Sequence, residues 1–258
     1  MKTVLNDVTF VIPIRIDSII RLENLLLTID CLLSYFETNI VVIEASNYNN
    51  GILEQLVGRK VTYYFYEERD PVFHRTKILN RMSIAITTKW IGIWDADIVM
   101  HNYQIQDAIC QLRTGLYDYA YPYDGRFLDT SMILRHHYLR YRDLTFLDQH
   151  QGMMQLLYTT ADKKNAVGGA FLISTEKYRQ SGLENEAFYG WGAEDGERFY
   201  RWKILNYREY RSSGPLYHLS HPRDHNGRVR SDYHEYQMMY EYDRIRNSTK
   251  IELSHEKR

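Results

Sequence analysis

Two aspartates stand directly after an aliphatic segment near the middle of the chain. Residues 91–94 read Ile-Gly-Ile-Trp, and Asp95-Ala96-Asp97 follows. In an extended chain, residues two apart face the same way, so both carboxylates can meet at the end of a strand. Carboxylates there suit a hard divalent cation and its phosphate ligands. Because such a tripeptide is also common in solvated turns, its position after a strand is what favours a metal site.

The second half of the chain offers two imidazoles, His218 and His221, three residues apart. A single histidine is more often a hydrogen-bonded structural residue than a metal ligand. Together with Asp97, however, His221 can complete a mixed site of carboxylate and imidazole. Nitrogen ligands favour transition metals, so this ligand set suits Mn²⁺ better than Ca²⁺.

A tryptophan between two glycines precedes a pair of acids in residues 189–195, which read Tyr-Gly-Trp-Gly-Ala-Glu-Asp. The glycines permit a tightly turned backbone that carries a large flat side chain. Glu194 and Asp195 then stand at the expected start of a helix, where acids complement the helix dipole. Alternatively, one acid is a general base beside an aromatic platform for a sugar ring. The aspartates at 95 and 97 in the same chain favour the second interpretation.

The first hundred residues are expected to form alternating strands and helices, and this framework would position the candidate residues. Such βαβ units favour a mostly parallel sheet with helices on its faces, and ligands bind beyond the carboxyl ends of its strands. Apolar runs and helical periodicity predict strands at 8–14, 40–43, 61–66 and 90–94 and helices at 22–36 and 78–86.

The second half is less regular and richer in tyrosine. The polar, aromatic segment 122–150 is interpreted as an insertion or as an excursion that covers the surface. In the tail, Tyr233, Tyr236 and Tyr240 recur at helical spacing and are expected to form a packing stripe. The remaining pattern predicts helices at 103–112 and 197–205 and strands at 167–174 and 216–220.

Composition narrows the class of protein. The 258 residues include 32 Lys+Arg and 33 Asp+Glu, a formal net charge of −1, which argues against nucleic-acid binding. The isolated Cys31 and Cys110 argue against a zinc ribbon or a disulfide framework and favour a reducing compartment. No stretch approaches the roughly 18 apolar residues of a membrane span. We therefore expect a soluble, cytoplasmic protein, and its 23 tyrosines suit polar, ring-shaped ligands.

From about residue 8 to residue 224, the order and spacing of these segments resemble the β-1,4-galactosyltransferase family. The polypeptide N-acetylgalactosaminyltransferases and the bacterial chondroitin-type polymerases share the Trp-Gly-x-Glu-Asp segment and are close rivals. The motifs that carry the resemblance are VIPIR at 11–15, FHRTKILN at 73–80, the DxD at 95–97, GG at 168–169, WGAED at 191–195 and HPRD at 221–224.

The resemblance implies an α/β fold of the GT-A nucleotide-sugar-binding type, with a mostly parallel central sheet flanked by helices. The implied catalytic domain spans residues 1–225, with a nucleotide-binding half at 1–100 and an acceptor and metal half at 101–225. Residues 226–258 would form a helical tail.

The same resemblance implies a role for each matching residue. His218 falls where the family has a methionine metal ligand, a replacement that would relax the demand for Mn²⁺ toward Mg²⁺. Trp191 matches a residue that moves over the donor as a loop closes. The implied sets are Asp195 with Glu194 for catalysis, Asp97, His221 and His218 for the metal, and Pro13, Ile14, Arg15, Phe73, Arg75, Asp95, Ala96, Gly169 and Trp191 for the nucleotide sugar.

The implied activity is a metal-dependent, inverting transfer of galactose or N-acetylgalactosamine from a UDP-sugar to a glycan hydroxyl. Gly196 replaces an acid that helps to hold N-acetylglucosamine in animal relatives, and Ala166 leaves room for an N-acetyl group on the donor. The acceptor is expected to be a glycan or a lipid-linked sugar of a bacterial or viral surface polysaccharide, met at the inner face of the membrane. We look for it near the tyrosines of 117–141, with Tyr189 bordering the sugar. A retaining enzyme and a catalytically silent sugar-binding module remain alternatives.

Overall fold

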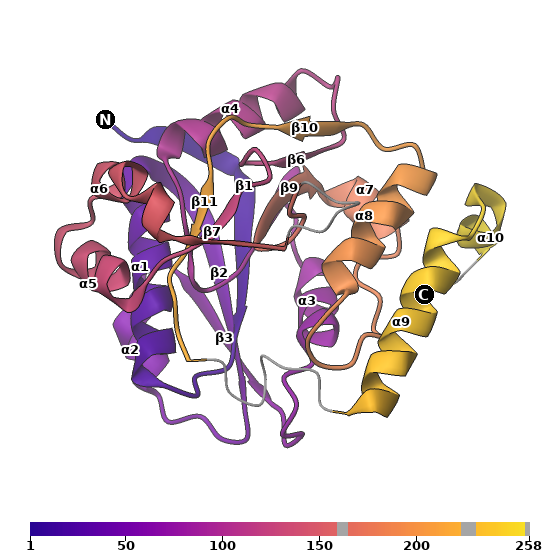
Figure 1. Ribbon diagram of the computed structural model, residues 1–258, viewed down its shortest axis with the longest axis horizontal. Coiled ribbons are helices and arrows are strands. Elements are labelled where there is room, and N and C mark those ends of the chain that lie inside the picture. Colours follow the sequence, from indigo (N-terminus) through magenta and orange to yellow (C-terminus); the bar gives the residue numbers. More distant parts are fainter. Residues whose placement is uncertain (159–164, 223–230, 256–258) are drawn as a thin grey trace.

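The computed structural model describes residues 1–158, 165–222 and 231–255, and its helices and strands are shown in Figure 1. The strands are β1 (Thr3–Ile14), β2 (Phe36–Ser46), β3 (Thr62–Glu67), β4 (Trp90–Trp94), β5 (Ile98–Val99), β6 (Tyr119–Tyr121), β7 (Phe127–Asp129), β8 (Gln155–Leu157), β9 (Ala170–Ser174), β10 (Glu209–Arg211) and β11 (Leu216–His218). The helices are α1 (Ile19–Tyr35), α2 (Ile52–Val57), α3 (Arg75–Ser83), α4 (Asn102–Arg113), α5 (Met132–Tyr141), α6 (Leu144–Gln149), α7 (Thr175–Gln180), α8 (Glu194–Ile204), α9 (Asp232–Arg246) and α10 (Lys250–His255), with a 3₁₀ turn at Gln151–Met153.

A seven-stranded sheet forms the centre of the molecule, in the order β3-β2-β1-β4-β9-β6-β10. β3, β2, β1 and β4 are parallel neighbours, and β6 pairs in parallel with β10. β9 runs antiparallel to both β4 and β6. β4 and the part of β1 from Val8 to Ile14 are buried, as expected for mostly apolar parallel strands covered on both faces. The expected α/β fold with a mostly parallel sheet is therefore confirmed.

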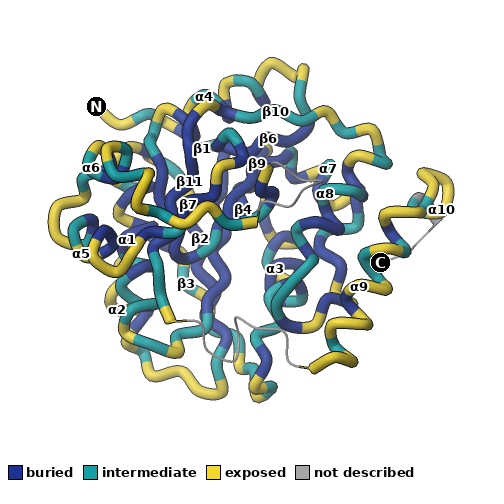
Figure 2. The backbone as a smooth tube through the Cα atoms, in the orientation of Figure 1, coloured by how far each residue is buried: buried dark blue, intermediate teal, exposed yellow. Residues whose placement is uncertain are grey.

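Helices flank this sheet on both sides. In Figure 1, α1 and α2 lie to one side of β1–β3, whereas α3 and α8 lie to the other. α1 begins where the side chain of Ser18 accepts a hydrogen bond from the backbone N–H of Arg21 at 3.3 Å, a normal N-cap. Figure 2 shows that burial concentrates along the central strands and the inner helix faces.

A second sheet of four short strands, β5-β11-β7-β8, was not anticipated from the sequence. β11 pairs antiparallel with β5 and parallel with β7. Segment 122–150 supplies β7 and the helices α5 and α6, so it does more than cover the surface. Its apolar side chains join a second core cluster with α1, through residues that include Leu27, Leu134, Leu144 and Leu147.

The tail helix α9 packs against α8. Its buried side chains are Met238 and Ile245, which lie seven residues apart on one face. Tyr233, Tyr236 and Tyr240 are 73, 64 and 60% exposed, so the predicted tyrosine packing stripe is wrong. The tyrosines follow helical spacing on the opposite face, and spacing alone does not say which face meets the core. None of the described helices combines the length and apolar character needed to cross a bilayer.

Candidate active site

Asp97, His218 and His221 converge through the pairing of the second sheet. Asp97 precedes β5, and β5 pairs with β11 so that Ile98 lies opposite His218. The Nε2 atoms of His221 and His218 are 3.1 and 3.5 Å from Oδ2 of Asp97. One ligand atom from each of the three residues lies within 4.8 Å of the others, so they can share one metal ion.

Charge and burial at this cluster also suit a cation. Burial alone would raise the pKa of Asp97, but His218 and His221 outweigh it and hold the pKa well below its ordinary value. Burial alone would lower the pKa of His218, yet Asp97 and Asp129 raise it to about 9. Nδ1 of His221 is 2.9 Å from the carbonyl oxygen of Pro222, which leaves Nε2 directed at Asp97. One carboxylate oxygen and two imidazole nitrogens form a donor set that fits Mn²⁺.

Asp95 faces a different partner. Nη2 of Arg75, the first residue of α3, donates to Oδ1 of Asp95 at 2.6 Å. The backbone N–H of Asp95 donates to the carbonyl of Gly169 at 2.8 Å, which joins the end of β4 to the start of β9. Burial raises the pKa of Asp95 despite Arg75, because Asp97 and Asp195 add negative charge. Gly169 has φ +79°, and an added Cβ would lie 2.7 Å from the ring of Phe127.

Glu194 and Asp195 begin α8, three residues earlier than predicted for this helix. Oε2 of Glu194 accepts a hydrogen bond from the backbone N–H of Gly192 at 3.0 Å. Burial and the charge of Asp195 raise the pKa of Glu194 to about 7. Nη2 of the fully buried Arg198 donates to Oδ1 of Asp195 at 2.6 Å. The acid pair thus has the position that each of the two interpretations requires. It lies at a helix N-terminus, where it complements the helix dipole, and it lies near Asp95, where one acid can act as a general base.

The absence of a side chain at Gly168 leaves room for the carboxylate of Asp195. A Cβ at Gly168 would lie 2.3 Å from Oδ2 of Asp195, closer than real Cβ contacts. The carbonyl of Gly168 accepts a hydrogen bond from the hydroxyl of Tyr123 at 2.7 Å, which holds the backbone in place. At Gly168 the backbone therefore approaches Asp195, the candidate base, more closely than a residue with a side chain would allow.

The loop that carries Trp191 has an unusual backbone. Gly190 and Gly192 have φ of +94° and +119°, and Ala193 adopts φ +63°, where a residue with a side chain is uncommon. An added Cβ at Gly190 would lie 3.2 Å from Val72 and 3.4 Å from His234. The loop therefore lies between the segment before α3 and the helix α9. Trp191 itself is half-buried.

The expected nucleotide residues occupy the end of β1 and the segment before α3. Nη1 of Arg15 donates to the carbonyls of Asp70 and Pro71 at 3.0 and 2.9 Å, and its guanidinium lies 5.7 Å from the ring centroid of Phe73. The hydroxyl of Tyr189 donates to the carboxylate of Asp70, which ties this segment to the Trp191 loop.

Two of the expected nucleotide-binding side chains pack elsewhere. Pro13 and Ile14 are buried in β1, and Ile14 is 1% exposed within the core. Any contact that they make with a ligand would come from the main chain. Ala96 is buried between the two aspartates, and its carbonyl accepts a hydrogen bond from Thr28 at 3.2 Å.

Arg75 lies near Asp95 and also near the Glu194–Asp195 pair. Burial would lower the pKa of Arg75, but the charges of Asp95, Asp195 and Glu194 raise it. The structure thus brings the DxD, the Trp-Gly-Ala-Glu-Asp segment and the two histidines to one edge of the central sheet. Arg223 and Asp224 of the last motif lie outside the described residues.

The sequence reading missed three charged residues of this region, Arg198, Arg21 and Asp129. Arg198 stands three residues after Asp195 on one helix face, so helical spacing could have indicated it. Arg21 places Nη1 3.9 Å from Asp97 and Nη2 3.4 Å from His221, and only the tertiary structure reveals this. Asp129 accepts a hydrogen bond from His218 across the second sheet.

Most of the six tyrosines in 117–141 lie in the core and not on a surface that an acceptor could reach. Four of them, Tyr119, Tyr121, Tyr123 and Tyr138, are at most 2% exposed. Tyr119 packs against Trp202 with ring centroids 4.6 Å apart, so these rings mostly build the core. Our expectation of an acceptor site there is wrong for these four residues.

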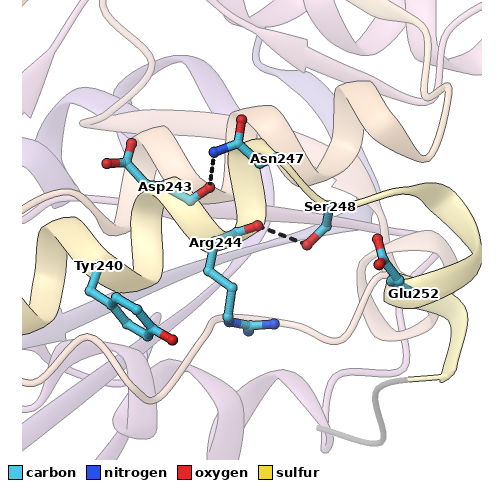
Figure 3. Close-up of a pocket in the computed structure, with 6 residues that line it drawn as sticks. All are labelled: Tyr240, Asp243, Arg244, Asn247, Ser248 and Glu252. Carbon is cyan, nitrogen blue, oxygen red and sulfur yellow. Dashed lines mark hydrogen bonds between the residues drawn. The ribbon is translucent and has the colours of Figure 1, made fainter.

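A hollow of about 550 Å³ lies at the C-terminal helices (Figure 3). Two of its polar side chains donate back to carbonyls of α9, Asn247 to Asp243 at 2.8 Å and Ser248 to Arg244 at 2.8 Å. None of the site residues predicted from the sequence lines it. The lining residues are Tyr240, Asp243, Arg244, Asn247, Ser248 and Glu252.

Comparison with known families gives one match, over residues 153–241, to the family described as the N-terminal domain of galactosyltransferase. The matched range includes Gly168, the Trp191 loop, the acid pair of α8 and both histidines. It does not include Asp95 or Asp97. Comparison with curated proteins finds no match. Together with the seven-stranded mixed α/β sheet, the family match supports a fold of the GT-A type.

Proposed function

On the premise that the match over residues 153–241 supports assignment of the chain to the galactosyltransferase family, we propose that it is a metal-dependent, inverting glycosyltransferase. It would transfer galactose or N-acetylgalactosamine from a UDP-sugar to a hydroxyl of a glycan, either free or lipid-linked. The observation that carries this proposal is the convergence of Asp97, His218 and His221 next to the Asp95–Arg75 pair.

The metal would be held by Asp97, His218 and His221. When bound, Mn²⁺ or Mg²⁺ supplies Lewis-acid stabilisation of the negative charge that grows on the diphosphate leaving group. Arg75 holds Asp95 at 2.6 Å and adds positive charge to the same edge of the sheet. His218 supplies a second nitrogen ligand. Titration of activity with Mn²⁺ and with Mg²⁺ measures how this ligand affects the preference between the two ions.

Asp195 is the proposed general base. As the acceptor oxygen attacks C1 of the donor sugar, its proton passes to the carboxylate of Asp195, and the bond from C1 to the diphosphate oxygen breaks. A single displacement of this kind inverts the anomeric centre. Arg198 orients the carboxylate through the 2.6 Å bond to Oδ1, and Gly168 leaves space at Oδ2.

The Trp191 loop is proposed to cover the donor. Water is a competing nucleophile, so a closed loop over the sugar would favour transfer over hydrolysis. Glu194 supports the loop by accepting the N–H of Gly192. The hydroxyl of Tyr189 links the loop to Asp70, whose carbonyl also accepts from Arg15 at 3.0 Å. Donor binding at Arg15 and loop position would therefore be connected.

The test is release of UDP from a panel of UDP-sugars with Mn²⁺ or Mg²⁺, combined with NMR of the product anomer. We expect activity with UDP-galactose or UDP-N-acetylgalactosamine and an inverted product. A retained anomer would identify the retaining alternative. Binding of UDP-sugar without any transfer or hydrolysis would identify a sugar-binding module instead.

A further inference from the structure

Asp129 lies directly behind one member of the metal cluster. It ends β7, and the parallel register of β7 with β11 places Asp129 opposite His218. Oδ1 of Asp129 is 2.7 Å from Nδ1 of His218. On the other side, β5 pairs with β11 and brings Asp97 to the Nε2 side of the same ring. His218 therefore stands between two carboxylates, one on each ring nitrogen.

This arrangement determines which ring nitrogen can bind a cation. An ionised carboxylate only accepts hydrogen bonds, so Nδ1 of His218 carries the proton that it donates to Asp129. A cation bound at this cluster would displace the proton from Nε2, whose lone pair would then face the cation on the side of Asp97. We propose that Asp129 is a positioning residue that holds His218 as an Nε2 metal ligand, an inference that rests on the proposed metal-dependent function. Outer partners of this kind orient the ring and increase its basicity.

The neighbouring backbone does not depend on the Asp129 carboxylate. The N–H of Thr130 donates to the carbonyl of His218 at 3.0 Å, and the N–H of Ser220 donates to the hydroxyl of Thr130 at 3.0 Å. These bonds hold β11 and the following turn in register. Replacing the carboxylate of Asp129 should therefore loosen the imidazole of His218 and leave the strand in place.

The two histidines differ in what orients them. Nδ1 of His221 lies 2.9 Å from the backbone carbonyl of Pro222, which no side-chain substitution removes, and 3.4 Å from Nη2 of Arg21. His218 has its Nδ1 against a side chain that is 22% exposed and replaceable. A change at Asp129 should thus weaken one ligand of the set and leave Asp97 and His221 unchanged, which predicts a partial loss of metal affinity.

The test is titration of the full chain with Mn²⁺, without nucleotide sugar, followed by electron paramagnetic resonance of free Mn²⁺. We expect Asp129→Asn and Asp129→Ala to bind Mn²⁺ about 10- to 100-fold more weakly than the wild-type chain. Asp148→Asn is the matched control, because Asp148 also pairs with a histidine, His101, at 2.7 Å but lies outside the metal cluster. It should bind Mn²⁺ as the wild type does.

A double-mutant cycle separates positioning from a general structural effect. If Asp129 acts through His218, then Asp129→Asn should cost nothing further in a His218→Met background. Additive losses in the double variant would overturn the proposal, as would wild-type affinity in a folded Asp129→Asn or Asp129→Ala chain. Circular dichroism checks folding, and either variant suffices. Failure of the wild-type chain itself to bind Mn²⁺ would instead overturn the metal-dependent function, so the two failures are distinguishable.

Discussion

The Asp97 cluster and the Glu194–Asp195 pair lie at the same edge of the central sheet but have opposite surroundings. Asp97 faces two imidazoles, which keep its pKa well below the ordinary value despite burial. Glu194 is buried beside Asp195, and its pKa rises to about 7. The first environment stabilises a carboxylate anion for a cation, and the second brings a carboxyl group into the range of proton exchange. Under the proposed function, such divergent environments would separate metal binding at Asp97 from proton transfer at the acid pair, where Asp195 is the proposed base.

The antiparallel strand β9 explains why the two clusters are neighbours. Asp95 and Asp97 follow the carboxyl end of β4, whereas Gly168 and Gly169 precede the amino end of β9. Because the two strands run in opposite directions, these ends meet, and the N–H of Asp95 bonds to the carbonyl of Gly169. Asp195 then reaches the site by packing against Gly168. A fully parallel sheet would not bring these segments together.

The largest expected effect on activity is at Asp195, the proposed general base of the acid pair. Asp195→Asn should lower kcat by about 10³-fold, within the 10²–10⁴ range for a positioned general base. Mn²⁺ and UDP affinity should stay unchanged, because Arg198 retains Glu184 as a second carboxylate partner at 3.0 Å. UDP release at saturating donor measures the loss. Asp30→Asn, at an exposed ion pair with Arg142, is the control. Near-normal turnover in Asp195→Asn would remove the general-base role.

The metal side should respond in binding. Asp97→Asn should weaken Mn²⁺ by more than the ~100-fold typical of an outer-shell residue, because it removes a direct ligand. Mn²⁺ titration followed by calorimetry gives the affinity. A metal affinity that is unchanged in Asp97→Asn would contradict the assignment of this cluster and would erase the contrast with the acid pair.

Gly168→Ala should displace Asp195 without changing the three proposed metal ligands, so it tests the acid pair separately from the Asp97 cluster. The φ of Gly168 lies outside the left-handed region, so the strain comes from the 2.3 Å contact with Oδ2 of Asp195. A displacement of about 1 Å can cost about 100-fold in rate. We expect kcat to fall about that much with an unchanged KM for the donor. An equal rise in KM would mean that Gly168 serves donor binding instead.

The smallest expected effect is the pH dependence of stability from Glu194. Its pKa is about 7 in the folded chain against an ordinary 4.5, so the folded state holds this proton more tightly than the unfolded state. This stabilisation is full below pH 4.5 and is lost as the pH rises through about 7. The free energy of unfolding should fall by about 2 kcal/mol from pH 5.5 to 8. In urea unfolding, the free energy of unfolding of Glu194→Gln should depend less on pH than that of the wild-type chain. An equal pH dependence in the two chains would refute the raised pKa of Glu194.

Much of the fold of residues 1–100 could be predicted because its signals are local. β4 is an uninterrupted apolar run, β1 is mostly apolar from Val8 to Ile14, and α1 has a cap residue followed by apolar residues at helical spacing. The strand predicted at 167–174 begins three residues later, at Ala170 after Gly169, and the helix predicted at 197–205 begins three residues earlier, at Glu194. Their ends agree with the prediction to within one residue. The α9 tyrosines were misplaced because helical periodicity does not identify the buried face.

The sequence alone was enough to select most of the candidate site residues: an acid pair after a strand, two histidines three residues apart, and two acids after a glycine-flanked tryptophan. Residue type and local spacing suffice for that, because a carboxylate or an imidazole has the same donor atoms in any fold. Only the tertiary structure decided how they combine. Cross-strand register placed Asp129 and Asp97 on opposite sides of His218, and the antiparallel β9 brought Gly168 to Asp195. These contacts join residues about 27 to 120 positions apart, and no short-range pattern encodes them.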